Sequence, residues 1–324
     1  MRNNSLEIYL EINKSNFIFF VGKYDEKNNL KIIHELKTQI VGLEDNRISD
    51  FDKVFNLMKE NIYLVEKKFN FTFKEIVIVL DYFNPSFLCL SGYKKLNGSQ
   101  ILKENINYIL TSLKSHVEKI ETNKTVLHIF NSKYILDNKK IDNLPIGLFG
   151  DFYNHELSFA LININNFKNL ENIFANCNLK IKKILLKSFI EGANISKRVK
   201  SSENFFHINI QEDNSKIFYF ENNSLKFEQN FKFGSNIILK DVSKVTSLKI
   251  STVKKILSQI QFDNEIDDDQ LVEEIFFNDE VFKKLRKKLI YEIIEARVKE
   301  ISEILIFNNI NINFYSKRVK TIFF

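Results

Sequence analysis

The sequence predicts an α/β protein in which two lobes share a βββαβα order and an α+β subdomain is inserted into the first lobe. The main observation is an internal repeat. Residues 9–36 and 206–233 each contain strand, polar turn, strand, polar turn and strand, and helical segments follow both meanders. In addition, a length of 324 residues exceeds what one hydrophobic core usually fills. Two unrelated α+β domains that both begin with hairpins are the alternative.

Alternating apolar and polar residues predict five strands in the first lobe. These strands cover residues 6–12, 16–24, 30–37, 75–81 and 179–187. Between the third and fourth strands we expect a helix that starts at Ser49, a residue type that favours N-caps, and continues to Phe69. Shorter helices are expected around Leu170 and over 188–196. The last strand is expected to return to the first sheet through a βαβ crossover.

The pattern of predicted strands and helices changes between residues 83 and 157, which predicts an inserted subdomain. Its expected elements are a helix over 99–117 and strands over 86–92, 125–130, 134–138 and 151–164. The first lobe is then 1–82 plus 158–198, and the insertion is 83–157. The second lobe is 199–324.

The second meander is followed by expected helices over 235–245 and 251–260, an acidic loop over 263–269 and a long helix from Phe282 to Leu305. The opening turns of the long helix carry Lys283, Lys284, Arg286, Lys287 and Lys288. Cations at the start of a helix oppose its dipole, which suggests a reason other than local stability. A solvated lysine face is the alternative interpretation.

Composition and charge argue against several functional classes. The net charge is only +6, and the 47 basic residues are spread over the whole chain, which does not indicate a nucleic-acid groove. The two cysteines, Cys89 and Cys177, lack metal-binding spacing and fit a reducing compartment. Glu7 and Glu11 interrupt the N-terminal apolar stretch, so no secretion signal is predicted, and the apolar runs fall below the ~20 residues of a membrane span. We therefore expect a cytoplasmic protein with no metal site.

The sequence shows no catalytic constellation. Its five histidines are dispersed, and His128 and His207 lie within strand patterns, where a core or sheet-face role is expected. The short motifs of serine hydrolases, P-loop enzymes, zinc proteases and dinucleotide-binding folds do not occur. The sequence therefore predicts no catalytic residues, and an enzyme is the weaker hypothesis.

One block of the chain, residues 126–195, contains in order a His strand, a Tyr-x-Leu/Ile-Asp strand, a Pro-x-Gly loop and a Cys-x-Leu-Lys return. The residues that carry these motifs are His128, Tyr134, Asp137, Pro145, Gly147, Gly150, Cys177, Leu179 and Lys180. In these motifs and their order the block resembles the bacterial cell-division protein family FtsA. Because 234–243 and 293–301 are also similar to the family, the resemblance covers nearly the whole chain. It implies a duplicated actin-like (ribonuclease H-like) fold with an inserted SHS2-type subdomain and a second lobe that is incomplete at its C-terminal end.

The resemblance implies that the two meander turns correspond to phosphate loops. The corresponding positions are Asn13, Lys14 and Ser15 in the first turn and Asn209, Gln211, Glu212, Asp213 and Asn214 in the second. The family's glycines, which let the backbone approach phosphates, are replaced at these positions, and its metal-organising Asp has become Asn209. Residues 306–324 also lack the glycines of the family's adenine-side loop.

We therefore predict no retained cofactor. ATP hydrolysis should be lost, and the binding of ATP and Mg²⁺ that the family implies should be weak or absent. Glu212 and Asp213 could instead serve as oxygen ligands for a cation, although a solvated hairpin turn is the favoured interpretation.

The resemblance implies a scaffold rather than an enzyme. Such a scaffold captures the C-terminal peptide of FtsZ, self-associates, recruits later divisome proteins and contacts the cytoplasmic side of the inner membrane at the division site. Arg297 matches the family's Glu-Pro-Arg helix position near the FtsZ-tail surface, where a cation suits an acidic tail. The alternative for Arg297 is a helix-surface ion pair with Glu292, Glu295, Glu300 or Glu303.

Two other functions are consistent with the same fold: a pilus-assembly adaptor of the PilM type and an actin-like ATPase that still binds ATP.

The C-terminal residues bear on membrane contact. Lys317, Arg318 and Lys320 beside 322–324 would form a basic and aromatic tip able to touch anionic lipid. The family continues with a lobe-completing segment and a membrane helix, so a truncated chain or an interior strand is the favoured alternative.

Overall fold

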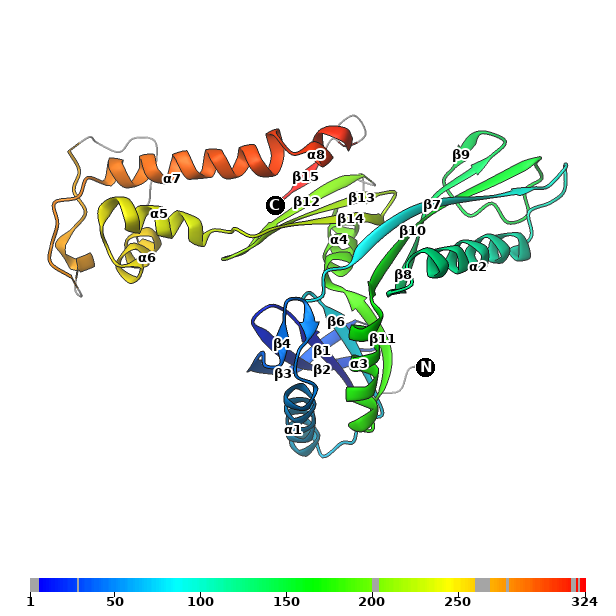
Figure 1. Ribbon diagram of the computed structural model, residues 1–324, viewed down its shortest axis with the longest axis horizontal. Helices are drawn as coiled ribbons and strands as arrows, with labels where there is room; N and C mark the ends of the chain where they lie inside the picture. The colour runs from blue at the N-terminus through cyan, green and yellow to red at the C-terminus, as the bar shows by residue number, and fades with distance from the viewer. Residues whose placement is uncertain are drawn as a thin grey trace. The chain divides into compact units, whose positions relative to one another are not determined.

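A computed structural model describes residues 6–27, 29–199, 204–259, 269–277, 280–315, 319 and 321–324. The chain divides into two compact units, whose elements are labelled in Figure 1. The first unit consists of Met1–Glu203 and Phe220–Phe227, and the second of Asn204–Tyr219 and Glu228–Phe324. The division therefore passes through the second meander, whose hairpin tip belongs to the first unit.

The first meander and its crossovers form a five-stranded sheet in the order β11-β6-β1-β2-β3. Its strands are β1 (Glu7–Ile12), β2 (Asn16–Tyr24), β3 (Leu30–Gln39), β6 (Glu75–Leu80) and β11 (Lys180–Leu186). The three meander strands are antiparallel neighbours, whereas β6 lies parallel to both β1 and β11. All five predicted strands and the predicted crossover are confirmed.

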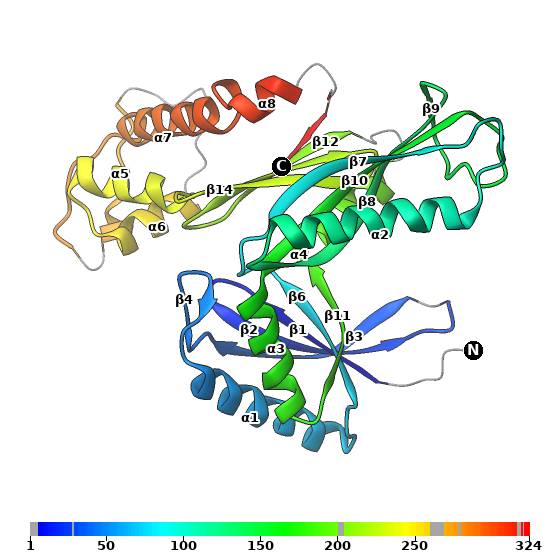
Figure 2. The same cartoon turned by 45° about the vertical axis from the view of Figure 1, so that its right-hand side comes forward.

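Helices α1 (Phe51–Phe69) and α3 (Ile164–Asn176) lie side by side against this sheet (Figure 1 and Figure 2), and α4 (Lys187–Arg198) follows β11. The N-cap predicted at Ser49 is wrong by one residue. The carboxylate of Asp50 accepts the backbone N–H of Lys53 at 3.0 Å. A carboxylate at this position satisfies a free N–H and also complements the helix dipole, so it is a favourable cap.

A short hairpin that was not predicted precedes α1. It consists of β4 (Leu43–Glu44) and β5 (Arg47–Ile48). Asp45 and Asn46 join them with φ values of 49° and 59°, which are the left-handed values of a two-residue hairpin turn. Two-residue strands are too short to show an alternating pattern, which is why the sequence did not reveal them.

The inserted segment forms a four-stranded sheet in the order β7-β10-β8-β9. Its strands are β7 (Ser86–Lys95), β8 (Lys124–Leu136), β9 (Lys139–Ile141) and β10 (Phe152–Asn163), and α2 (Lys103–Ile120) packs on the sheet. The strands predicted over 125–130 and 134–138 are in fact the single strand β8. Asn131, Ser132 and Lys133 resemble a turn in sequence, but Ser132 is the extra residue of a β-bulge opposite Glu156 and Leu157.

The second meander forms a sheet in the order β14-β13-β12-β15. Its strands are β12 (Phe205–Ile210), β13 (Ser215–Glu221), β14 (Ser224–Phe231) and β15 (Ile322–Phe323). β15 lies parallel to β12, just as β6 lies parallel to β1 in the first sheet. The repeat predicted from the sequence is therefore also a repeat of topology, with a parallel strand added beside the first strand of each meander.

The tip of the β13–β14 hairpin shares a charge network with the inserted sheet, within the first unit. Lys226 Nζ lies 2.6 Å from Glu156 and 3.6 Å from Glu221, and Lys133 Nζ lies 3.6 Å and 3.1 Å from the same two carboxylates. Burial raises the pKa of Glu156, but the hydrogen bond from Lys226 and the charges of both lysines lower it below its usual value. Charges at such depth are tolerated because they are paired.

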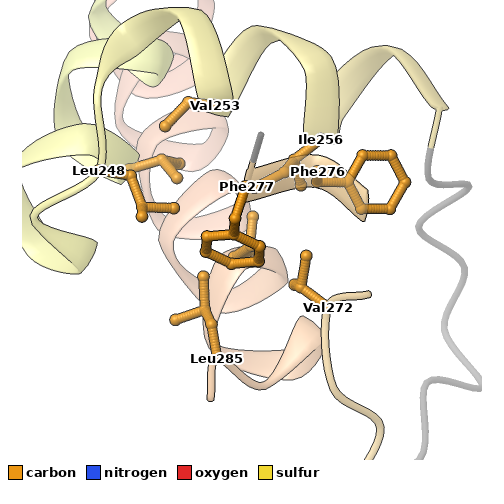
Figure 3. Close-up of a cluster of buried hydrophobic side chains, with 9 residues drawn as sticks. Leu248, Val253, Ile256, Val272, Phe276, Phe277 and Leu285 are labelled. Carbon is orange, nitrogen blue, oxygen red and sulfur yellow. The ribbon is translucent and has the colours of Figure 1, made fainter. Parts of the chain in front are cut away.

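Helices α5 (Asn236–Thr246), α6 (Ile250–Gln259) and α7 (Lys287–Ser302) enclose a hydrophobic core together with the 3₁₀ turn η1 (Glu274–Phe277). Figure 3 shows this core, in which Phe277 lies among Leu248, Val253, Ile256, Val272 and Leu285. The core residues are Val242, Leu248, Val253, Ile256, Val272, Phe276, Phe277, Leu285 and Ile290. A π-helical turn, η2 (Glu303–Phe307), and a short helix, α8 (Ile310–Tyr315), follow α7.

The long helix begins at Lys287, not at Phe282 as predicted. The preceding segment is extended, because Val272 N donates to Leu285 O at 2.8 Å and Lys287 N donates to Gln270 O at 2.8 Å. Lys283 lies before the helix and donates to the carbonyl of Ser247 at 2.7 Å, at the C-terminal end of α5. A cation at a helix C-terminus is favourable, so this lysine does not oppose a helix dipole.

The C-terminal residues support the interior-strand alternative over a lipid-contacting tip. Ile322 and Phe323 pair with Phe206 and His207 in the second sheet. Lys317, Arg318 and Lys320 lie outside the described residues, as does most of the predicted acidic loop (263–268). Within the described part of the chain, no helix combines the length and the apolar composition needed to cross a bilayer.

His155 on β10 provides a test of the inserted core by pH. Its side chain is fully buried, neither ring nitrogen has a hydrogen-bond partner among the described residues, and burial lowers its pKa from 6.5 to about 4. Because the unfolded chain binds more protons between these two values, stability should fall as the pH drops from about 6.5 to 4, by up to roughly 3 kcal/mol. Urea-unfolding midpoints should therefore fall less over this range in His155→Leu than in the wild type. A pH dependence that is identical in the two proteins would show that His155 is charged or solvated in the folded state.

Candidate functional site

The first predicted turn, between β1 and β2, is closed by its own asparagine. Asn13 Oδ1 accepts the backbone N–H of Ser15 at 3.0 Å and that of Asn16 at 2.8 Å. Asn13 N also donates to the carbonyl of Asn16 at 3.1 Å. Lys14 and Ser15 are exposed at the tip. Backbone N–H groups that a phosphate loop directs at its ligand are thus already bonded within this turn.

Next to this turn lies an ion cluster that sequence reasoning missed. The strands β1, β6 and β11 are parallel, so Glu11, Asp81 and Lys187 at their carboxyl ends meet at one edge of the sheet. Lys187 Nζ lies 2.7 Å from Glu11 Oε1 and 3.9 Å from Asp81 Oδ2. Burial lowers the pKa of Lys187, but the hydrogen bond to Glu11 and the charges of the nearby carboxylates outweigh burial and raise it. A charged residue at each of three parallel strand ends was the signal available in the sequence.

The second predicted turn follows β12, which contains Asn209. Gln211 N donates to Asn214 O at 2.9 Å, and Asn214 Nδ2 donates to Gln211 Oε1 at 2.6 Å. These two bonds form a compact hairpin turn. The side chains of Glu212 and Asp213 are exposed at its tip.

This turn is also bonded to the start of helix α5. Ser235 N donates to Gln211 O at 2.9 Å, and Asn236 N donates to Glu212 O at 2.8 Å. Asp213 Oδ1 accepts from Asn236 Nδ2 at 3.0 Å. The start of a helix is where an anion would bind, because its N–H groups are free there. Here carbonyls and a carboxylate of the turn occupy that place.

Gly234 allows this close approach. A Cβ added at Gly234 would lie 2.0 Å from the carbonyl oxygen of Gln211 and 2.7 Å from the backbone of Glu212. The family's glycines lie in the turn and admit a phosphate. In this chain Gly234 lies at the start of α5, where the absence of a side chain lets the second turn approach closely.

In the predicted adenine-side segment, residues 306–324, an asparagine side chain also accepts backbone N–H groups. Asn309 is buried, and its Oδ1 accepts the N–H groups of Asn311 at 3.0 Å and Ile312 at 3.1 Å, which caps α8. Asn309 Nδ2 donates to Gln229 Oε1 at 3.1 Å on β14. An asparagine cap therefore stands in a segment where the family has a glycine loop.

Arg297 is engaged in ion pairs within the second unit. Its guanidinium donates to Asp241 on α5 and to Glu300 one turn further along α7. The hydrogen bond from Asp241 and the charges of both carboxylates raise its pKa. Glu300 is one of the partners considered from the sequence. Asp241 could not be identified there, because it contacts Arg297 only through the packing of α5 on α7.

The acidic tip of the second turn has few neighbours that could complete a cation site. Across the described ranges no group of three or more His, Cys, Asp or Glu side chains is arranged to hold a metal ion. The two predicted turns belong to different units, and each is closed by contacts inside its own unit.

Comparison with known proteins adds two findings to this geometry, although no family model matches the chain. FtsA of Buchnera aphidicola subsp. Schizaphis graminum is 23% identical over 259 residues, which is 79% of this chain and 60% of that protein. FtsA of the Baizongia pistaciae subspecies is 20% identical over 302 residues, which is 91% of this chain and 70% of that protein. The chain thus spans well under the full length of these relatives.

Among solved structures, a chain of the PilM-PilN type IV pilus biogenesis complex is similar in fold. The TM-score is 0.57 at 9% sequence identity, with 99% of this chain and 82% of that chain covered. This similarity and the repeated topology of the two sheets define a protein of the actin-like ATPase fold class, with duplicated lobes. Within that class, the chain is similar in sequence to FtsA proteins, at 19% to 23% identity. The fold predicted from the repeat and from residues 126–195 is confirmed.

The contact between the second turn and α5 can be tested at Gly234. Gly234→Ala places a methyl group on the Gln211 carbonyl, and we expect a loss of unfolding free energy of about 1–3 kcal/mol from this overpacking. Ser235→Ala is the matched control, because Ser235 Oγ is exposed and makes only a 3.5 Å contact. Urea unfolding of both variants measures the difference. Equal stability of Gly234→Ala and the wild type would contradict the close approach.

Proposed function

We propose that this protein is a non-catalytic cell-division adaptor that links FtsZ to the cytoplasmic face of the membrane and recruits other divisome proteins. The similarity to FtsA proteins supports the cell-division role. The observation that carries the non-catalytic part is the bonding around the two turns: Asn13 accepts the N–H groups of Ser15 and Asn16. The carbonyls of Gln211 and Glu212 accept those of Ser235 and Asn236 at the start of α5, where an anion would otherwise bind. The adaptor would be peripheral to the membrane at the division site and would self-associate.

We further propose that the adaptor is organised as a first lobe (1–82 plus 158–198), an insertion (83–157) and a second lobe (199–324). The separate sheet formed by β7 to β10 supports the insertion, with β10 continuing past its boundary to Asn163. In this organisation the insertion offers a surface for later divisome proteins, and the helices α5 to α7 offer one for the FtsZ tail.

A pilus-assembly adaptor is the alternative within the same fold, because a PilM-PilN complex shares it. The two functions differ in the partner peptide. Binding of the FtsZ C-terminal peptide, with no binding of a pilus membrane-protein tail, supports the cell-division proposal, and the reverse result supports the alternative.

Nucleotide binding is expected to be absent or weak. Glu212 and Asp213 would each repel a nearby triphosphate by about 1 kcal/mol even in a water-like dielectric. In the first turn the N–H groups of Ser15 and Asn16 are already bonded, and in the second that of Gln211. Isothermal titration with ATP and Mg²⁺ should show no saturable binding at ATP concentrations up to about 1 mM. The dissociation constant should therefore exceed about 1 mM, which corresponds to a binding free energy of about −4 kcal/mol. The paired variant Glu212→Gln, Asp213→Asn should also fail to bind, because it removes the charge but not the closure. Micromolar affinity of the wild type would instead identify a protein that still binds ATP.

Arg297 is the proposed contact for the acidic tail of FtsZ. Arg297→Ala should weaken binding of the FtsZ C-terminal peptide about tenfold, which corresponds to about 1.4 kcal/mol. The measurement is fluorescence anisotropy with the labelled peptide at low and high salt, because a charge contact weakens with ionic strength.

Asp241→Asn is the matched control for Arg297. It removes the same ion pair between α5 and α7 but leaves the guanidinium available to a partner. Peptide binding should therefore be kept or tightened in Asp241→Asn. If the two variants lose affinity equally, Arg297 only positions α5 on α7 and does not touch the peptide.

A further inference from the structure

The ion cluster at the carboxyl edge of the first sheet carries an inference of its own. Glu11 is the next-to-last residue of β1, Asp81 directly follows β6, and Lys187 directly follows β11. The side chains of Glu11 and Asp81 are only 15% and 11% exposed, and that of Lys187 is 29% exposed. The fold thus brings two largely buried carboxylates to one ammonium group.

Two carboxylates held this close to one point need a compensating positive charge. They can acquire it in three ways: by sharing a proton, by binding a divalent cation or by contacting a cationic side chain. The contacts show which way this chain uses. Lys187 Nζ lies 2.7 Å from Glu11 Oε1 and 3.9 Å from Asp81 Oδ2, and Glu11 Oε1 also accepts from Asn13 Nδ2 at 3.2 Å.

We propose that the Lys187 ammonium is a tethered cation that takes the place of a divalent metal ion between Glu11 and Asp81. The cation is part of the chain, so it cannot dissociate, and the edge of the sheet is neutralised whether or not Mg²⁺ is present. The arrangement also joins the first turn to β11, because Asn13 and Lys187 both bond the same carboxylate oxygen. The inference concerns metal alone and holds whether or not the adaptor proposal is correct.

The raised pKa of Lys187 agrees with this geometry, because it keeps the ammonium charged at any physiological pH. A second lysine, Lys182 on β11, provides a comparison. Lys182 Nζ lies 2.8 Å from Glu7 and 3.9 Å from Glu75, almost the same distances, but Glu75 is 49% exposed. Water already solvates that carboxylate, so the removal of Lys182 should not create a place for a metal ion.

The test removes the positive charge of Lys187 and supplies free Mn²⁺ in its place. Mn²⁺ binding to the full chain is measured by electron paramagnetic resonance without nucleotide, for the wild type, Lys187→Met and the matched control Lys182→Met. We expect Lys187→Met to bind Mn²⁺ at least tenfold more tightly than either of the other two proteins. The double variant Lys187→Met, Glu11→Gln should lose this gain, because one of the two carboxylates is then neutral.

The proposal is overturned if the wild type binds Mn²⁺ as tightly as Lys187→Met, or if Lys182→Met shows the same gain. If Lys187→Met does not fold, the wild type alone decides the matter. Amine-reactive labelling followed by mass spectrometry should modify Lys187 more slowly than Lys182, and 10 mM Mg²⁺ should not change the ratio. A faster reaction of Lys187 in Mg²⁺ would show that the metal displaces it. ATP titration addresses the adaptor proposal separately, since no nucleotide is used here.

Discussion

A buried backbone N–H needs an acceptor, and at several turns and helix starts of the described chain that acceptor is another group of the chain itself. Asn13 accepts two N–H groups in the first turn, and Asn309 does the same at the start of α8. Carbonyls of Gln211 and Glu212 serve the start of α5. Phosphate-binding turns leave such groups for a ligand. Here those N–H groups are bonded within the chain, so they do not require a nucleotide as acceptor.

Several charged side chains are likewise paired with partners within the chain. Lys187 neutralises the carboxyl edge of the first sheet, Lys226 pairs with Glu156 at the hairpin tip, and Arg297 joins α7 to α5 through Asp241. Each of these groups would be costly to bury alone, and each is held by a partner on another element. These ion pairs hold separate elements together.

The positions of the candidate site residues along the chain could be predicted from the sequence. Their hydrogen-bond and ion-pair partners could not. The two turns and Arg297 were placed at the correct ends of strands and on the correct helix, because hairpin periodicity and the family resemblance fix position along the chain. The partners of these residues could not be identified. Asp241 meets Arg297, and Gly234 meets Gln211, only after α5 packs on its neighbours. The helix was predicted to start at Phe282, because residues 282–286 continue its apolar pattern, but residues 285–287 are bonded to 270–272 instead.

The sequence by itself determined the duplicated meanders, the α/β class and the loss of glycine from the turns, because these properties are local: side-chain period, turn composition and backbone freedom act within a few residues. The bonds made by the residues that replace the glycines depend instead on the folded chain. Parallel pairing of β1, β6 and β11 gathers charges that are 70 or more residues apart in the sequence at one sheet edge. In the same way, the packing of α5 against the second turn supplies acceptors for its first N–H groups. Burial makes such contacts strong, and burial is a property of the folded chain and not of any segment of it.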